Sequence, residues 1–95
     1  MRGYMAVYID KMNTQYRNMI MCHMLADTEQ ELIDMAKNIG VDPRWIQYQG
    51  TYKAHFDICL AKKEKALKLG AIEITHSQLR ALLRAKKVNM EEYKV

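Results

Sequence analysis

Two histidine–aspartate pairs are the residues of this sequence best suited to chemistry. His55 and Asp57 flank Phe56, and His23 precedes Asp27 by four residues. Residues two apart in an extended segment face the same side, so the imidazole of His55 and the carboxylate of Asp57 can act together. A carboxylate beside an imidazole fixes the tautomer of the ring, as general acid–base catalysis requires. Structural roles stay open: Asp57 as the N-cap of a following helix, and His23 as a core residue within an apolar run.

Polar residues also follow the ends of the predicted strands. Ligands of open parallel sheets bind beyond the carboxyl ends of the strands, where loops and helix N-termini meet. We therefore expect one polar edge, with His23, His55 and Asp57 in one pocket and Trp45 or Gln47 on its wall. The residues at this expected edge are Asp10, Lys11, His23, Asp27, Gln47, His55, Asp57, Thr75 and His76.

The sequence does not predict a metal site or a cofactor. Asp10, Asp27 and Asp57 are of the type that Mg²⁺ prefers, but nothing in their spacing is typical of a metal site. Cys22, Cys59 and the three histidines also lack the paired spacings of zinc sites. The sequence contains no glycine-rich phosphate loop, GxSxG elbow or HExxH motif.

Aromatic and basic residues favour an anionic ligand with a ring that can stack. Tyr48 and Tyr52 lie on either side of Gly50, and Trp45 is a further candidate for stacking on a base, although tryptophan is also a common core residue. Lys62, near the start of a predicted helix, is the candidate for a phosphate contact. The expected ligand-binding residues are His23, Asp27, Trp45, Gln47, His55, Asp57 and Lys62.

Three helices are predicted near residues 28–39, 58–69 and 76–87. Capping-box spacings at Thr28–Glu31 and Thr75–Gln78 start the first and third, and Gly40 and Gly70 follow the first and second. We interpret residues 5–10, 44–48 and 71–75 as strands and 11–17 as a loop. Residues 18–26 form an apolar run whose length favours a strand and whose methionines favour a helix, and we prefer the strand. The tail at 88–95 is expected to fray.

Strands therefore alternate with helices from residue 18 to 87. Such alternation is typical of a parallel sheet with helical crossovers. We predict a small single α/β domain over residues 1–95, with a mostly parallel sheet of about four short strands and three helices.

Composition indicates a globular chain with a basic second half. Of 95 residues, 49% are hydrophobic and 27% are charged. Residues 1–52 carry five Lys or Arg and six Asp or Glu, whereas residues 53–95 carry ten and five, so the halves contribute −1 and +5 to the net charge of +4. A basic half favours anionic partners such as a nucleotide or nucleic acid, and a solvated helix surface is the alternative. The sequence shows neither a membrane-spanning run nor a signal peptide, so a cytoplasmic location is expected.

The order of several short motifs resembles a family of small uncharacterised phage and bacterial proteins, domain of unknown function 4031. The similar segments run from about residue 5 to 80: 5–10, 19–28, Trp45 with Gln47, Gly50 with Thr51, 55–59, 62–63 and 70–75. The family often has Tyr at position 56, Arg at 63 and Pro at 52, where this chain has Phe, Lys and Tyr. The resemblance implies a phage or bacterial cytoplasmic domain and brings no known activity with it.

Three functions are consistent with these features. The first is a phage-type domain that binds an anionic, nucleotide-like ligand, in one version sequestering a host defence signal. The second is a small hydrolase or nuclease that uses His23, His55 and Asp57, with or without a metal ion. The third is an accessory factor that binds nucleic acid or protein through the basic third helix. Eight methionines in a small domain also favour a homo-oligomer that covers an apolar face.

Overall fold

The computed structural model describes residues 6–11, 14–16 and 19–93. The helices are α1 (Glu29–Ile39), α2 (Leu60–Lys68) and α3 (His76–Tyr93), and a short 3₁₀ helix, η1, spans Pro43–Trp45. The strands are β1 (Val7–Asp10), β2 (Thr14–Tyr16), β3 (Met19–Ala26), β4 (Phe56–Cys59) and β5 (Ile72–Ile74). The small α/β domain with three helices is therefore confirmed, and residues 18–26 contain a strand.

The sheet is mixed, so the prediction of a mostly parallel sheet is wrong. On one edge of β3, β4 pairs antiparallel; on the other edge, β1 and β2 both pair antiparallel with it. The parallel pair is β1 with β5. The physical reason is the short connection between β1 and β3, which consists of residues 11–18. A link this short allows antiparallel pairing, whereas parallel neighbours need a crossover of a dozen or more residues.

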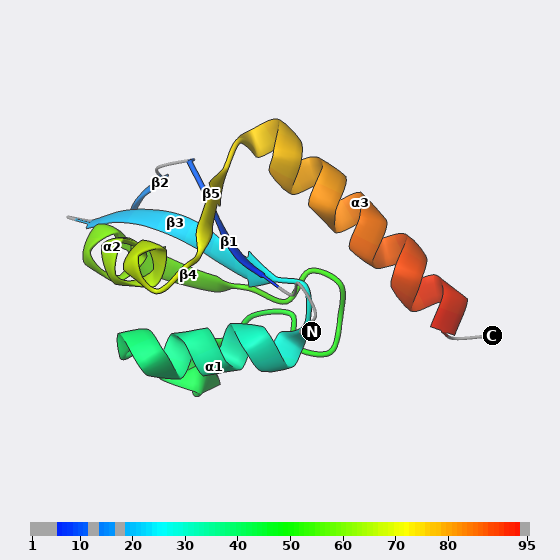
Figure 1. Ribbon diagram of the computed structural model, residues 1–95, viewed down its shortest axis with the longest axis horizontal. Helices are drawn as coiled ribbons and strands as arrows, with labels where there is room; N and C mark the ends of the chain where they lie inside the picture. The colour runs from blue at the N-terminus through cyan, green and yellow to red at the C-terminus, as the bar shows by residue number, and fades with distance from the viewer. Residues whose placement is uncertain (1–5, 12–13, 17–18, 94–95) are drawn as a thin grey trace.

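Helices cover both faces of the sheet (Figure 1). Alternate residues of β3 point to opposite sides, so Cys22, Met24 and Ala26 pack with α1 and α2, while Leu25 packs with Leu79 of α3. The larger core also contains Phe56 and Ile58 of β4, which are almost fully buried. Consequently, Asp57 and His23, which alternate with these core residues, belong to the face that α3 covers.

The predicted starts of the first and third helices agree with the structure. The Thr28 hydroxyl accepts a hydrogen bond from the backbone N–H of Glu31, and Thr75 and Gln78 form the full reciprocal box. Gly40 ends α1 with φ of 84°, a left-handed conformation that glycine adopts without steric cost. The third helix continues to Tyr93, where the sequence suggested an end near Lys87, because no glycine or proline interrupts residues 88–93.

Besides the end of the third helix, three further predictions along the chain are wrong. The expected loop at 11–17 contains strand β2, whose residues pair with the start of β3. The expected strand at 44–48 is replaced by η1, since the Asp42 carboxylate accepts a hydrogen bond from the N–H of Arg44 and Pro43 occupies the first helical turn. The second helix begins at Leu60 rather than near residue 58, because residues 56–59 pair with β3. Cys59 is therefore the N-cap of α2, and Asp57 does not cap this helix.

A buried lysine ties the second helix to the sheet. Lys63 of α2 is only 9% exposed. Its ammonium donates to the Glu73 carboxylate on β5 at 2.7 Å and to the Asp10 carbonyl on β1 at 3.4 Å. This hydrogen bond, together with the positive charge, lowers the pKa of Glu73 from its ordinary 4.5.

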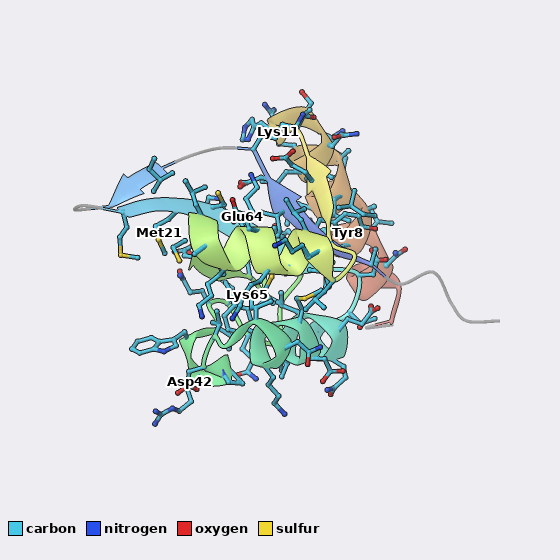
Figure 2. The ribbon with its side chains drawn as sticks, turned by 60° about the vertical axis from the view of Figure 1, so that its left-hand side comes forward. Tyr8, Lys11, Met21, Asp42, Glu64 and Lys65 are labelled. Atoms are coloured by element: carbon cyan, nitrogen blue, oxygen red, sulfur yellow. The ribbon has the colours of Figure 1, made fainter. Side chains whose placement is uncertain are left out.

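We expect Glu73→Gln to lower the melting temperature at pH 7. The pKa of Glu73 is lower in the folded state than its ordinary value of 4.5. The ionised carboxylate therefore stabilises the fold fully above pH 4.5, and this stabilisation is lost as the pH falls through the lower pKa of the folded state. The difference in melting temperature between wild type and variant should therefore shrink in acid. Glu64→Gln, which alters an exposed glutamate of α2 next to Lys63 (Figure 2), is the control and should melt like wild type throughout. A pH-independent difference for Glu73→Gln would contradict this account.

Candidate functional site

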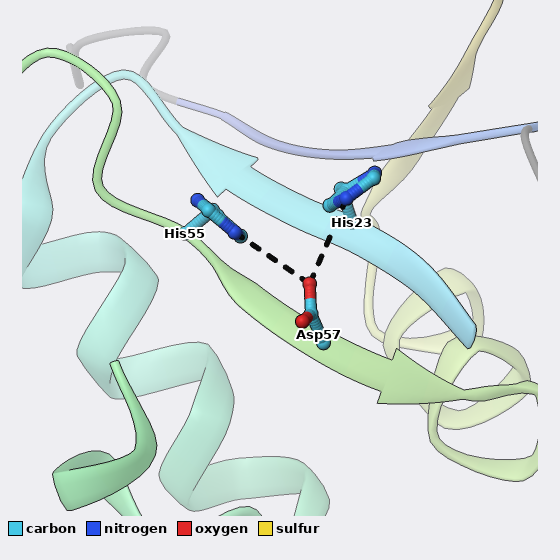
Figure 3. Close-up of side chains that lie close together, drawn as sticks. All are labelled: His23, His55 and Asp57. Carbon is cyan, nitrogen blue, oxygen red and sulfur yellow. Dashed lines mark ion pairs between the residues drawn. The ribbon is translucent and has the colours of Figure 1, made fainter. Parts of the chain in front are cut away.

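The side chains of His23, His55 and Asp57 lie close together (Figure 3), and the two histidines share a cavity with Leu79 and Leu83 of α3. His23 and Asp57 are direct cross-strand neighbours of β3 and β4, and His55 precedes β4 in a single bridge with Gln47. The Asp57 Oδ1 atom lies 3.7 Å from His23 Nε2 and 3.5 Å from His55 Nε2. The two imidazole rings meet edge to face with centroids 5.4 Å apart.

A buried carboxylate orients His23. The Asp10 side chain is fully buried at the end of β1, and its two oxygens lie 2.9 Å from the backbone nitrogen of His23 and 2.7 Å from Nδ1 of the ring. An ionised carboxylate only accepts hydrogen bonds, so Nδ1 carries a proton and donates it. In the neutral ring, Nε2 of His23 is then the atom with a lone pair, and it is this atom that faces Asp57.

The other two side chains are held in a similar way. Nδ1–H of His55 donates to the Lys53 carbonyl at 2.8 Å, and because a carbonyl cannot donate, this bond also fixes the tautomer. The Gln47 amide donates to Asp57 Oδ2 at 2.7 Å. Each of the three clustered residues thus uses one polar atom for positioning and turns the other toward the common centre. We call His23, His55 and Asp57 the histidine cluster.

A cavity of 240 Å³ adjoins this cluster between the sheet and α3. Its floor is apolar, formed by Leu25, Leu79 and Leu83. The remaining lining comes from His23, His55, Tyr48 and Lys53. The Tyr48 ring is stacked on His55 at 5.8 Å between centroids, and the Lys53 ammonium lies 5.9 Å from the centroid of the Tyr48 ring.

Two larger cavities lack this combination of groups. A cavity of 490 Å³ is lined by Glu31, Asp34 and Asn38 together with apolar residues, and among the described residues no histidine or basic side chain lines it. One of 350 Å³ lies between the Gly50 loop and α3 and includes Asp27, Glu29 and Lys86. The Lys86 ammonium is engaged there, donating to the Ala26 carbonyl at 2.6 Å, and burial lowers its pKa.

The structure brings four of the seven expected ligand-binding residues together, and they lie on a face of the sheet rather than at its carboxyl edge. These four are His23, Gln47, His55 and Asp57. The expected edge is not where they meet because β3 and β4 are antiparallel, so their carboxyl ends point in opposite directions. Cross-strand pairing in the middle of the two strands joins the residues instead.

The other three expected residues lie outside the cluster. Asp27 binds the N–H of Ala6 and the hydroxyl of Tyr8, which fastens the start of β1. The pKa of Tyr8 is raised, mainly because the side chain is partly buried and also because of the hydrogen bond to Asp27. Trp45 is 70% exposed on η1, and the Lys62 ammonium lies beside Gly40 at the end of α1. Lys62 belongs to α2, which packs on the opposite face of the sheet, so its side chain cannot reach the cavity.

Sequence reasoning missed Lys53 and the positioning role of Asp10. Asp10 was noted as a strand-end acid, but its contact with His23 requires β1 to pair with β3. Lys53 had no periodicity or motif to distinguish it from the other lysines. Tyr48 was recognised only through its closeness to Gly50.

Comparison with known protein families gives a match over nearly the whole domain. A family model described as "Protein of unknown function (DUF4031)" matches residues 7–86, which include strands β1 to β5 and the histidine cluster. The chain belongs to this family. No curated protein and no solved structure matches it. The DUF4031 chain has no helix in its described part that is long and apolar enough to cross a membrane.

We expect His23→Ala to destabilise this DUF4031 domain. The substitution removes the ring that binds Asp10 Oδ2, and a buried acceptor left without its partner costs about 1–3 kcal/mol in the free energy of unfolding. His76→Ala, at an exposed position, should stay within about 0.5 kcal/mol of wild type. Urea unfolding of the two variants provides the comparison. If His23→Ala and His76→Ala have equal free energies of unfolding, the contact between Asp10 and His23 does not stabilise the fold.

Proposed function

We propose that this protein binds a small anionic ligand with a planar ring, of the mononucleotide class, in the cavity beside the histidine cluster. The observation that carries the proposal is the lining of that cavity. A stacked pair of rings, a lysine and a leucine floor surround one space. Each of these groups matches one part of a nucleotide.

The apolar floor and the aromatic groups suit the base. Leu25, Leu79 and Leu83 exclude water from one side, and the exposed Tyr48 ring offers a face on which a base can stack. Stacking of a base on an aromatic side chain contributes about 1–3 kcal/mol. The cavity volume of 240 Å³ lies just below the usual range of about 300–1,000 Å³ for ligand sites. A single nucleotide, partly exposed, fits this size better than a dinucleotide does.

The polar groups suit the phosphate. Lys53 is exposed at the cavity and lies between the rings of Tyr48 and Tyr52, at 5.9 and 5.8 Å from their centroids. The strongly basic second half of the chain favours approach of an anion from solution. Lys53 takes the role of phosphate contact that the sequence suggested for Lys62.

The backbone of Tyr48 supports a binding role for this ring. Tyr48 is the one residue other than glycine with a positive φ in the described part of the chain, at 57°. Left-handed backbone costs an ordinary residue about 1–2 kcal/mol, and such strain is concentrated at functional sites. A ring kept 60% exposed at this cost is better explained by a ligand than by folding. If the chain is encoded by a phage, retention of an intact nucleotide would sequester a host signal.

Lys53→Ala should weaken nucleotide binding about 10- to 150-fold, the effect of removing a charge-assisted hydrogen bond of about 1.5–3 kcal/mol. Lys62→Ala is the matched control and should bind like wild type, since Lys62 lies beside Gly40. The measurement is isothermal titration with a panel of linear and cyclic mononucleotides in the presence of EDTA. No binding by wild type, or equal loss in both variants, would contradict the proposed site.

Tyr48→Gly separates binding from folding. Glycine adopts the left-handed conformation without strain, so the variant should melt at or above the wild-type temperature while its nucleotide affinity falls. Thermal melting and the same titration measure the two effects. A large loss of stability would assign the Tyr48 ring to the scaffold.

A second candidate function, hydrolysis of the bound nucleotide, is favoured by the contact between Asp10 and His23. A buried carboxylate that holds Nδ1 leaves Nε2 available as a general base beside the cavity. Incubation with the nucleotide panel, followed by denaturation and chromatography, distinguishes the candidates. Recovery of intact nucleotide supports binding alone. Conversion that is lost in His23→Asn, which keeps an N–H donor for Asp10 but lacks Nε2, and that is kept in His76→Ala supports hydrolysis.

A further inference from the structure

We propose that the histidine cluster is a binding site for a divalent transition-metal ion of the zinc class. The site goes beyond the nucleotide proposal and does not depend on it. It requires only three atoms that converge: Nε2 of His23 and Nε2 of His55, which both face Oδ1 of Asp57. One ligand atom from each of the three residues lies within 4.8 Å of the others.

The protonation pattern leaves these atoms as three acceptors. Both Nδ1 atoms are committed as donors, to Asp10 and to the Lys53 carbonyl, so both Nε2 atoms carry lone pairs in the neutral rings. The Asp57 oxygen is also an acceptor. A metal ion placed between three acceptors that face a common centre can bind all three at once.

The spacing fits metal ligands better than hydrogen-bond partners. The separations of 3.5 and 3.7 Å between Asp57 Oδ1 and the two nitrogens exceed the usual hydrogen-bond range of about 2.7–3.2 Å. A tetrahedral site with bonds of about 2.0–2.1 Å places neighbouring ligand atoms about 3.3–3.4 Å apart. A small inward shift of the side chains therefore produces the ligand geometry.

Outer contacts hold every candidate ligand. Asp10 orients His23, the Lys53 carbonyl orients His55, and Gln47 holds the second oxygen of Asp57. Metal-binding histidines typically donate their other N–H to a carboxylate or a backbone carbonyl, and ligating carboxylates are themselves hydrogen-bonded. All three of these arrangements occur in this cluster, which a chance meeting of polar side chains does not require.

The ligand set also selects the class of metal. Two imidazole nitrogens and one carboxylate suit zinc and neighbouring first-row transition metals, whereas Mg²⁺ prefers oxygen ligands. Three protein ligands leave at least one coordination position open. The side chains of His23 and Asp57 are 36% and 40% exposed, so an ion can enter from solvent. Because both histidines also line the 240 Å³ cavity, a ligand there would lie next to the ion.

The test is titration of the metal-free full chain with Zn²⁺ by calorimetry and with Co²⁺ by visible absorption, both without nucleotide. We expect one equivalent to bind, with cobalt d–d bands and no thiolate charge-transfer band. Asp57→Asn keeps the side-chain shape and the oxygen that Gln47 can contact, and should bind more than about 100-fold more weakly, as should His55→Ala. Gln47→Ala removes only an outer contact and should cost about 10- to 100-fold.

His76→Ala and Cys59→Ser are the matched controls, since they remove an exposed histidine and the more accessible cysteine. Both should bind zinc like wild type. Absence of one-equivalent binding, a cobalt spectrum with thiolate character, retained affinity in Asp57→Asn and His55→Ala, or loss of affinity in either control would each overturn the proposal. Because this titration contains no nucleotide and the nucleotide titration contains EDTA, failure of one proposal leaves the other standing.

Discussion

The fully buried carboxylate of Asp10 is the interaction on which both the sheet and the site depend. One oxygen binds the backbone of His23 and the other binds its ring, so a single side chain fastens β1 to β3 and sets the direction of the imidazole. The backbone carbonyl of the same residue accepts a hydrogen bond from the buried Lys63. A buried charge is tolerated only when it is paired and hydrogen-bonded, and Asp10 meets this requirement through His23.

The antiparallel pairing of β3 with β4 decides which residues can cooperate. It places His23 opposite Asp57 and Met24 opposite Phe56, so polar and apolar residues separate onto opposite faces. The apolar face packs against α1 and α2, and the polar face lies beneath α3. A shift of one residue in this register would exchange the two faces, which would bury Asp57 and expose Phe56. The core therefore enforces the geometry of the site.

The proposed nucleotide site and the proposed metal site use different side-chain atoms of one region. The leucine floor, Tyr48 and Lys53 can hold a nucleotide with or without a metal, while the three converging acceptor atoms can hold an ion without any nucleotide. Their closeness has a chemical consequence if both are correct. A transition-metal ion polarises a bound phosphate and activates water, so the same cavity would then favour hydrolysis over retention.

The sequence by itself determined the local features. Capping residues at Thr28 and Thr75 and the glycine at position 40 marked helix ends, because caps depend on contacts within a few residues. The spacing of His55 and Asp57 similarly predicted that they share a face. Family membership, too, could be recognised from the order of short motifs.

Only the tertiary structure decided how these pieces combine. The direction of β3, the strand hidden in residues 56–59, and the contacts of Asp10 and Gln47 all rest on pairing between distant segments. The alternation of helices and strands along the sequence is the same whether all strands are parallel or one of them is antiparallel. Likewise, no local sequence feature distinguishes Lys53 from Lys62. In the fold, however, Lys53 lines the cavity and Lys62 lies beside Gly40. Long-range pairing is set by burial summed over the whole core, and a single segment does not contain that information.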